Sequence, residues 1–129
     1  MKKLIKEIPL ANGITVRFFD ATRRYFGDYH QVRVTICCEL PLGEDLFDSA
    51  EAYQAAGRLL GPSVRYLKEI EQQGVAGEET SLAVQRVIRQ FVEHSLPYFE
   101  SEAFPRKLLQ SELDKRRNSG PFLKLSTNG

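Results

Sequence analysis

The sequence predicts an α+β fold in two layers: a three-stranded antiparallel β-meander, in the order 1-2-3, with three or four helices packed on one of its faces. One observation behind this prediction is the segment 29–42, in which apolar and polar residues alternate with a period of two. A second is a series of apolar stripes at helical spacing after residue 48. A third is a pair of short turn signals, Asn12-Gly13 and Gly27-Asp28, which favour hairpins between consecutive strands.

The segment 29–42 is predicted to be a strand with one face in the core. Its alternation extends over ten residues and is rich in β-branched side chains. The predicted core face carries Val32, Val34, Ile36, Cys38 and Leu40, and the opposite face carries Gln31, Arg33, Thr35, Cys37 and Glu39.

The other two strands are predicted over residues 4–10 and 14–25. A three-residue loop that ends at Gly13 sets Leu10 opposite Ile14, so that apolar residues face apolar residues across the first hairpin. The Gly27-Asp28 turn by itself sets apolar Phe18 opposite Cys37 on the polar face. We therefore predict a β-bulge near Phe19-Asp20, which would place Phe18 opposite Cys38.

Helices are predicted over residues 49–60, 63–73, 80–95 and 105–117, from apolar stripes and from glycine and proline at their ends. The tail 118–129 is polar and contains Gly120-Pro121, and we expect it to be poorly ordered.

Length and composition predict one soluble domain over residues 1–129. A chain of this length buries enough surface to fold without disulfide bonds or metals. The net charge is +1, so the chain lacks the strong overall field that is typical of nucleic-acid and anionic-membrane binders. The two cysteines are adjacent, point to opposite faces of a strand and favour a reducing compartment, so we expect a cytoplasmic protein without a membrane span.

No catalytic or metal-binding motif is present. The sequence has no G-x-S-x-G, G-x-G-x-x-G or P-loop pattern, and its two histidines lack metal-ligand spacing. The acidic residues ahead of the predicted first helix are explained by the helix dipole. We therefore expect no cofactor, no metal and no catalytic residues, and the sequence gives no indication of an enzyme.

The candidate interaction surface lies around segment 18–33, where basic and aromatic residues crowd together. Tyrosine, phenylalanine and arginine are the residue types that protein interfaces favour, so we expect binding to a protein. The alternative is a single-stranded nucleic-acid binder, in which rings stack on bases and arginines reach phosphates. The candidate residues are Arg17, Phe19, Arg23, Arg24, Tyr25, Phe26, Tyr29, His30, Arg33 and Cys37.

The second face of the predicted sheet points to self-association. It is too mixed for a core, yet it has few of the lysines and glutamates of a solvated face. Its members are Thr15, Arg17, Phe19, Arg33, Thr35 and Cys37. We expect a homodimer, the commonest closed assembly, that acts as a regulatory or adaptor module and binds a further protein. A third hypothesis is a thiol sensor or enzyme based on Cys37, whose pKa the neighbouring arginines would lower.

Overall fold

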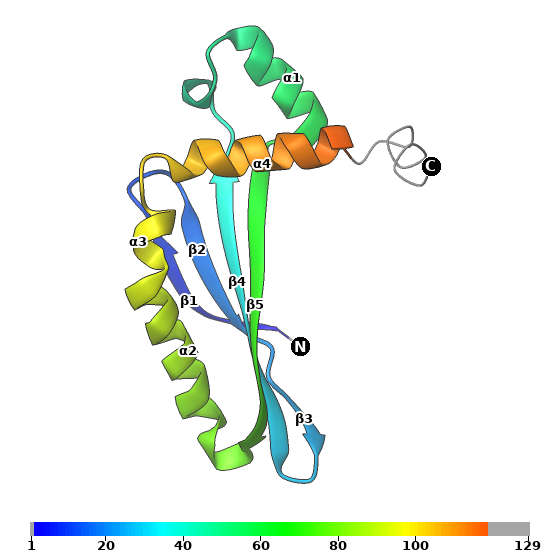
Figure 1. Cartoon of the computed structure of the whole chain (residues 1–129), viewed down its shortest axis with the longest axis vertical. Helices are drawn as coiled ribbons and strands as arrows, with labels where there is room; N and C mark the ends of the chain where they lie inside the picture. Colours follow the sequence, from blue (N-terminus) through cyan, green and yellow to red (C-terminus); the bar gives the residue numbers. More distant parts are fainter. Residues whose placement is uncertain (1, 119–129) are drawn as a thin grey trace.

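The computed structural model describes residues 2–118, and it is an α+β protein with an antiparallel sheet. The tail predicted from residue 118 lies, from residue 119 onward, outside the described residues. Figure 1 shows a long sheet with two consecutive helices, α2 (Thr80–His94) and α3 (Leu96–Phe99), running along it and α4 (Phe104–Asn118) crossing one end.

The strands are β1 (Lys3–Pro9), β2 (Thr15–Asp20), β3 (Arg23–Phe26), β4 (Tyr29–Pro41) and β5 (Ser63–Ala76). The helices are α1 (Ala50–Leu60), α2 (Thr80–His94), α3 (Leu96–Phe99) and α4 (Phe104–Asn118), with single 3-10 turns at Glu44–Leu46 and Gly77–Glu79.

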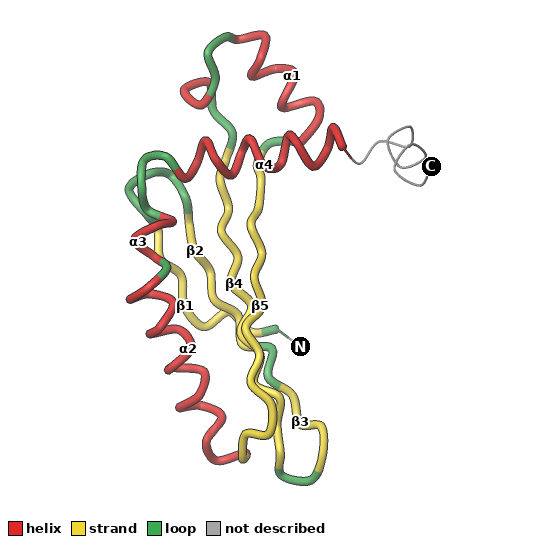
Figure 2. The backbone as a smooth tube through the Cα atoms, in the orientation of Figure 1, coloured by secondary structure: helices red, strands yellow, loops and turns green. Residues whose placement is uncertain are grey.

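The long strand β4 is the centre of the sheet. β1 pairs with β2, β2 pairs with β4, and β5 pairs with β4 along its other edge. The short strand β3 continues the register of β2 along β4, because Asp20 faces Val34 and Arg23 faces Gln31. The predicted meander order is therefore confirmed, and a further strand is added at its edge (Figure 2).

The first hairpin has the predicted register. Ile8 faces Val16, and the Leu10 N–H donates to the Ile14 carbonyl at 2.8 Å. Gly13 has φ 91°, a conformation that glycine adopts without the strain of a side chain. The amide of Asn12 donates to the carbonyl oxygens of Phe99 (2.8 Å) and Ser101 (2.9 Å), which fastens this loop to the helical layer.

The predicted β-bulge at Phe19-Asp20 is wrong. The β2–β4 register runs without a break from Thr15 opposite Glu39 to Asp20 opposite Val34. The irregularity lies beside the turn, between Arg24 and Phe26, and strand pairing also stops at Ala21-Thr22. Phe18 therefore faces Ile36 rather than Cys38. The two registers differ by two residues, so both keep Phe18 in the core.

The predicted helix over 63–73 is also wrong, because these residues form most of β5. Val64 and Ile70 are six residues apart, and both fit the inward positions of a helix and of a strand. The neighbours decide between the two periods: Tyr66 is half-buried, whereas Leu67, inward in the helical reading, is 62% exposed. Pairing with the free edge of β4 outweighs the local helical pattern, because strand preference depends on tertiary context.

The other predicted helices match the structure to within one or two residues, and a short α3 follows α2. The Oγ of Ser49 accepts the Ala52 N–H at 3.1 Å and caps α1. Pro97 lies in the first turn of α3, where its missing N–H is tolerated.

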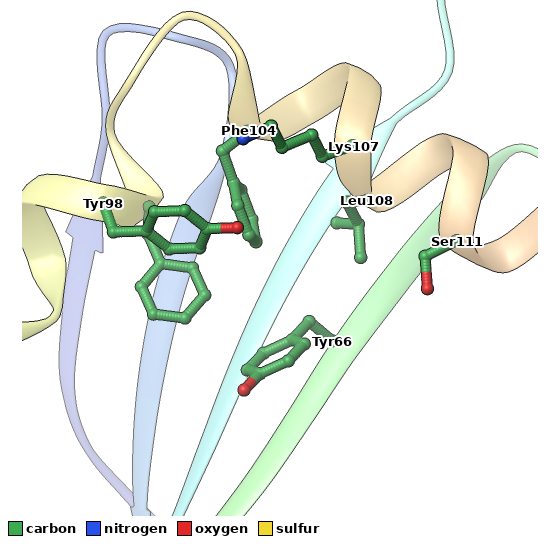
Figure 3. A pocket seen from close by; sticks show the side chains of 7 residues that line it. Tyr66, Tyr98, Phe104, Lys107, Leu108 and Ser111 are labelled. Carbon is green, nitrogen blue, oxygen red and sulfur yellow. The ribbon is translucent and has the colours of Figure 1, made fainter.

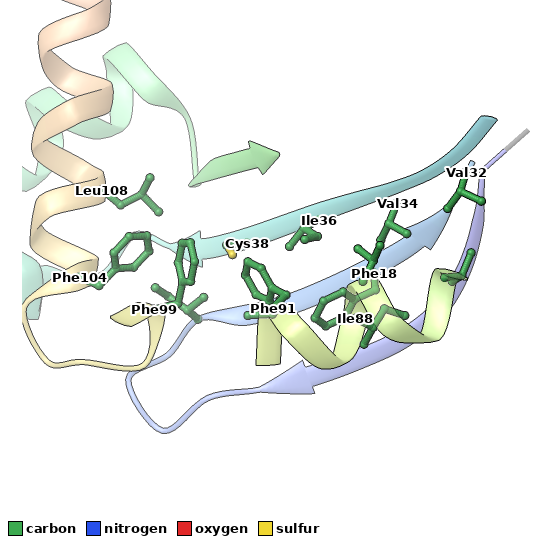
Figure 4. Packing of buried hydrophobic residues seen from close by; sticks show 14 of the residues in the cluster. Phe18, Val32, Val34, Ile36, Cys38, Ile88, Phe91, Phe99, Phe104 and Leu108 are labelled. Carbon is green, nitrogen blue, oxygen red and sulfur yellow. The ribbon is translucent and has the colours of Figure 1, made fainter. Parts of the chain in front are cut away.

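The core lies between the sheet and the helices α2, α3 and α4 (Figure 4). The alternation of β4 predicted its strand face correctly, since Val32, Val34, Ile36 and Cys38 are fully buried. The rings of Phe18 and Phe91 meet edge to face, with their centroids 5.6 Å apart.

Replacing Phe18 with alanine should lower the free energy of unfolding by about 3–5 kcal/mol, because it removes a fully buried ring and leaves a cavity. Urea unfolding followed by circular dichroism measures this loss. The matched control is Phe26→Ala, whose ring is 73% exposed and whose loss should change stability by less than about 0.5 kcal/mol. Equal effects of the two substitutions would contradict this account of the core.

Candidate functional site

The face of the sheet opposite α2, α3 and α4, here called the open face, is the candidate site. No helix among residues 2–118 packs over its centre, and its side chains come from alternate positions of four strands. These side chains are Leu4, Glu7, Arg17, Phe19, Arg33, Thr35, Cys37, Glu39, Arg65, Leu67, Glu69 and Glu71.

The centre of the open face is a shallow hollow of about 260 Å³. Its floor is buried although no helix covers it, since Thr35 is 2% exposed and Cys37 is 9% exposed. Phe19 and Leu67 flank this floor on the neighbouring strands, and Leu67 is largely exposed. The rest of the lining is charged and consists of Lys2, Arg17, Glu39 and Arg65, so the hollow combines apolar side chains with ionised ones. Such a mixture is typical of the surfaces that bind proteins.

At one end of the open face, Arg17 holds two carboxylates. Its Nε lies 2.6 Å from Glu7 Oε2 and its Nη1 lies 3.0 Å from Glu39 Oε1. The Nε of Arg65 lies 3.6 Å from the other oxygen of Glu39. The hydrogen bond from Arg17, helped by the charges of both arginines, lowers the pKa of Glu39, while hydrogen bonds to Glu39 and Glu7 raise the pKa of Arg17.

At the other end, Arg33 takes the same role. Its Nη2 lies 2.7 Å from Glu71 Oε2 and donates to Gln31 Oε1 at 3.1 Å. Its Nη1 lies 3.9 Å from Glu69, a looser contact. Gln31 also accepts from Arg23 at 3.1 Å, which places the first arginine of the hairpin on the open face.

Cys37 lies at the floor of the hollow and is almost fully buried. Burial raises its pKa, and this effect outweighs the charges of Arg65 and Arg17, which act in the opposite direction. Burial also raises the pKa of Cys38, in the core, to about 12. The lowered thiolate pKa on which the thiol-sensor hypothesis depends is therefore not found at Cys37.

The structure divides the predicted site residues into two groups. Arg17, Phe19, Arg23, Arg33 and Cys37 belong to the open face. The others gather at the protruding tip of the β3–β4 hairpin (Figure 1), where three aromatic residues are at least half exposed. This tip group consists of Arg24, Tyr25, Phe26, Tyr29 and His30.

Sequence reasoning missed the part of the open face that β5 contributes. Arg65, Leu67, Glu69 and Glu71 were assigned to a helix, so their alignment beside β4 was not foreseen. The available signal was the alternation of Val64, Tyr66 and Ile70 with exposed residues after Gly61-Pro62.

A second hollow, of about 270 Å³, lies on the core side of the sheet between α3, α4 and β5 (Figure 3). Aromatic rings of Tyr66, Tyr98 and Phe104 line it, and Lys107 Nζ lies 5.9 Å from the centre of the Tyr98 ring. The protein therefore supplies its own cation to this ring, and Ser111 is the other polar residue of the lining besides the two tyrosines.

Comparison with protein-family models, curated proteins and solved structures finds no match to this chain. None of the helices over residues 2–118 has the length and apolar character of a membrane span. The same residues contain no cluster of three or more side chains suited to hold a metal ion. The open face itself therefore carries the functional argument.

The lowered pKa of Glu39 predicts a loss of stability in acid. The folded protein binds the ionised carboxylate through Arg17, so this stabilisation is fully present above the ordinary glutamate pKa of about 4.3. It disappears as the pH falls from there through the lower folded pKa. The stability difference between wild type and Glu39→Gln, at most about 1 kcal/mol for such a solvent-accessible pair, should therefore shrink below about pH 4. Urea unfolding between about pH 2 and 7 measures it, and a difference that does not change with pH would refute the assignment.

The raised pKa of Cys37 predicts slow alkylation. In the native protein near neutral pH, iodoacetamide should react with Cys37 more slowly than with free cysteine, because burial raises the pKa of Cys37 and lowers its access to the reagent. The rate should rise with pH, and denaturation in urea should make both cysteines reactive. Mass spectrometry of wild type and Cys37→Ser assigns the reaction to its residue. Alkylation faster than that of free cysteine would restore the thiol hypothesis.

Proposed function

We propose that the protein is a cytoplasmic protein-interaction module that works as a homodimer and binds a further protein through the open face. The observation that carries this proposal is the hollow of the open face, where the apolar side chains of Phe19 and Leu67 stand among charges that are mostly paired with one another. Two unpaired cysteines fit a reducing compartment.

The charge pattern explains why such a face suits a partner. The charges of the face nearly cancel, with a net charge of +1, because five basic residues lie among four acidic ones: Lys2, Arg17, Arg23, Arg33 and Arg65, and Glu7, Glu39, Glu69 and Glu71. Most of these groups satisfy one another within the plane of the sheet, and a partner therefore need not supply counter-charges. The expected partner is a protein segment with an uncharged apolar side chain for the hollow and polar groups for its rim.

The size of the hollow favours a short segment of a partner over a second sheet. The hollow's volume of about 260 Å³ is below the roughly 300–1,000 Å³ of a pocket for a drug-sized ligand, so it has room for only a few side chains of a partner. Closing the whole face against a second sheet would remove ionised groups at both ends from water, at a cost of several kcal/mol for each ion. Recognition of a short segment at the hollow lowers that cost, because Arg33, Glu69 and Glu71 lie outside the hollow and remain hydrated.

The experiment that tests the proposal has two parts. Light scattering over a concentration series should give a molar mass of twice the 14.7 kDa of one chain. Peptides selected on the wild-type protein from a displayed library should bind Phe19→Asp at least about tenfold more weakly, because the substitution removes the aromatic ring from the wall of the hollow and leaves a charge where an apolar side chain of the peptide would pack. The dimer of this variant should remain intact.

The control variant is Leu82→Asp, which introduces the same charge on an exposed position of α2 and should leave peptide binding unchanged. Thermal melts of both variants establish that they are folded. A wild-type protein that is monomeric at every concentration would refute the homodimer. Selected peptides that bind Phe19→Asp as well as wild type would refute the open face as the binding surface.

A further inference from the structure

The outer edge of β5 is a long strand edge without a neighbour in the described structure. β5 has 14 residues and pairs with β4 alone. From Leu67 to Gly74 every residue except Ile70 is exposed. The unpaired N–H and C=O groups of an edge strand are a template for another strand, and a length well above the usual five or six residues makes this template extensive.

Two hydrogen bonds identify the residues that turn their backbone groups to this edge. The Leu42 N–H donates to the Pro62 carbonyl at 2.9 Å, so these opposed residues form a hydrogen-bonded pair across β4 and β5. On the other side of β4, the Ala21 N–H donates to the Arg33 carbonyl at 2.8 Å. Hydrogen-bonded and non-bonded pairs alternate in an antiparallel ladder. The even-numbered residues of β5 from 64 to 72 therefore direct their backbone N–H and C=O groups toward β4. The odd-numbered residues from 63 to 71 direct theirs toward the outer edge.

The side chains of these outward residues lie on the open face. Around one residue, positive and negative side chains are placed so that a two-fold axis would set opposite charges against each other. Leu67 is central, with Arg65 two residues before it and Glu69 two residues after it. If β5 pairs antiparallel with a second β5 around a two-fold axis at Leu67, Arg65 faces Glu69 of the partner subunit, and the symmetry repeats this pair. On the core side the same register sets Val64 opposite Ile70 of the partner subunit.

The neighbouring registers lack this match. An axis at Lys68 sets lysine opposite lysine and Leu67 opposite a glutamate. An axis at Glu69 sets two glutamates opposite each other, and an axis at Tyr66 sets Arg65 opposite leucine. An axis between two consecutive residues would set each outward-directed residue opposite one whose backbone groups point to β4, so the two strands could not form their hydrogen bonds.

The charged groups concerned are available for this pairing. The side chain of Arg65 is 67% exposed and lies 3.6 Å from Glu39. Glu69 is 48% exposed and 3.9 Å from Arg33, whose closer contact at 2.7 Å is with Glu71. Both side chains can therefore reach across the edge without breaking the short ion pairs of the open face.

We propose that β5 pairs with β5 of a second copy of this chain, antiparallel and in register around a two-fold axis at Leu67. The two sheets then form one continuous sheet, and the open faces of both subunits lie side by side and remain accessible. This inference rests on the proposed function, because it describes how the homodimer forms.

Charge reversal tests the register. In Arg65→Glu, glutamate faces glutamate in both symmetry-related pairs, and in Glu69→Arg, arginine faces arginine. Each variant should weaken the dimer at least about tenfold, as seen in the dissociation constant from sedimentation equilibrium. An equimolar mixture of the two variants should form a heterodimer within about threefold of the wild-type affinity, because both pairs are then Glu–Arg.

The matched control is Arg89→Glu, the same charge change at an exposed position of α2, which should leave the dimer unchanged. Circular dichroism of each variant checks folding, and recovery on mixing shows that neither variant is misfolded. Suppose that the wild type is dimeric. If either variant alone is then as dimeric as the wild type, or if the mixture does not regain the wild-type affinity, the β5 register is refuted and the homodimer stands. If the wild type is monomeric, the homodimer of the proposed function fails, and the edge pairing fails with it.

Discussion

The rest of the structure depends on the alternation of β4. Its even-numbered residues from Val32 to Leu40 belong to the core, beside residues of β2 and β5, and its odd-numbered residues form the middle of the open face. Both of its edges are occupied, by β2 and β3 on one side and by β5 on the other. A slip of one residue in either register would turn the apolar side chains of β2 or β5 away from the helices, so the hydrophobic face specifies the pairing of the whole sheet.

The two faces of the sheet are shielded from water by different groups. On the core side, apolar side chains of α2, α3 and α4 remove the sheet from water. On the open face, long side chains shield the backbone and one another, so that Thr35 is almost inaccessible without a covering helix. Ion pairs in the plane of the sheet hold these side chains over its surface, as Arg17 does with Glu7 and Glu39. Exposed pairs of this kind add little stability, and their effect is to position side chains and to neutralise the surface.

This arrangement gives the molecule three separate surfaces. The open face has a hollow of mixed apolar and charged lining, the outer edge of β5 offers backbone hydrogen bonds, and the hairpin tip presents Tyr25, Phe26 and Tyr29 to solvent. Edge pairing and recognition at the open face are compatible, because the first uses groups in the plane of the sheet and the second uses groups above it. A dimer formed through the edge would carry two copies of the hollow on one side, an arrangement suited to a partner with two binding segments.

The sequence by itself determined the fold class, the first hairpin and the core face of β4. These depend on local patterns: a period of two over ten residues, a glycine where the loop requires positive φ, and apolar stripes at helical spacing. It also identified Arg17, Phe19, Arg33 and Cys37 as members of one mixed face, because side chains two apart on a strand lie on the same side. Only the tertiary structure decided that 63–76 is a strand, since Val64 and Ile70 fit both periods and the free edge of β4 settled the choice. The site therefore remained half-predicted: Arg65, Leu67 and Glu69 join it through pairing between segments about thirty residues apart, and no local pattern encodes such long-range hydrogen bonds.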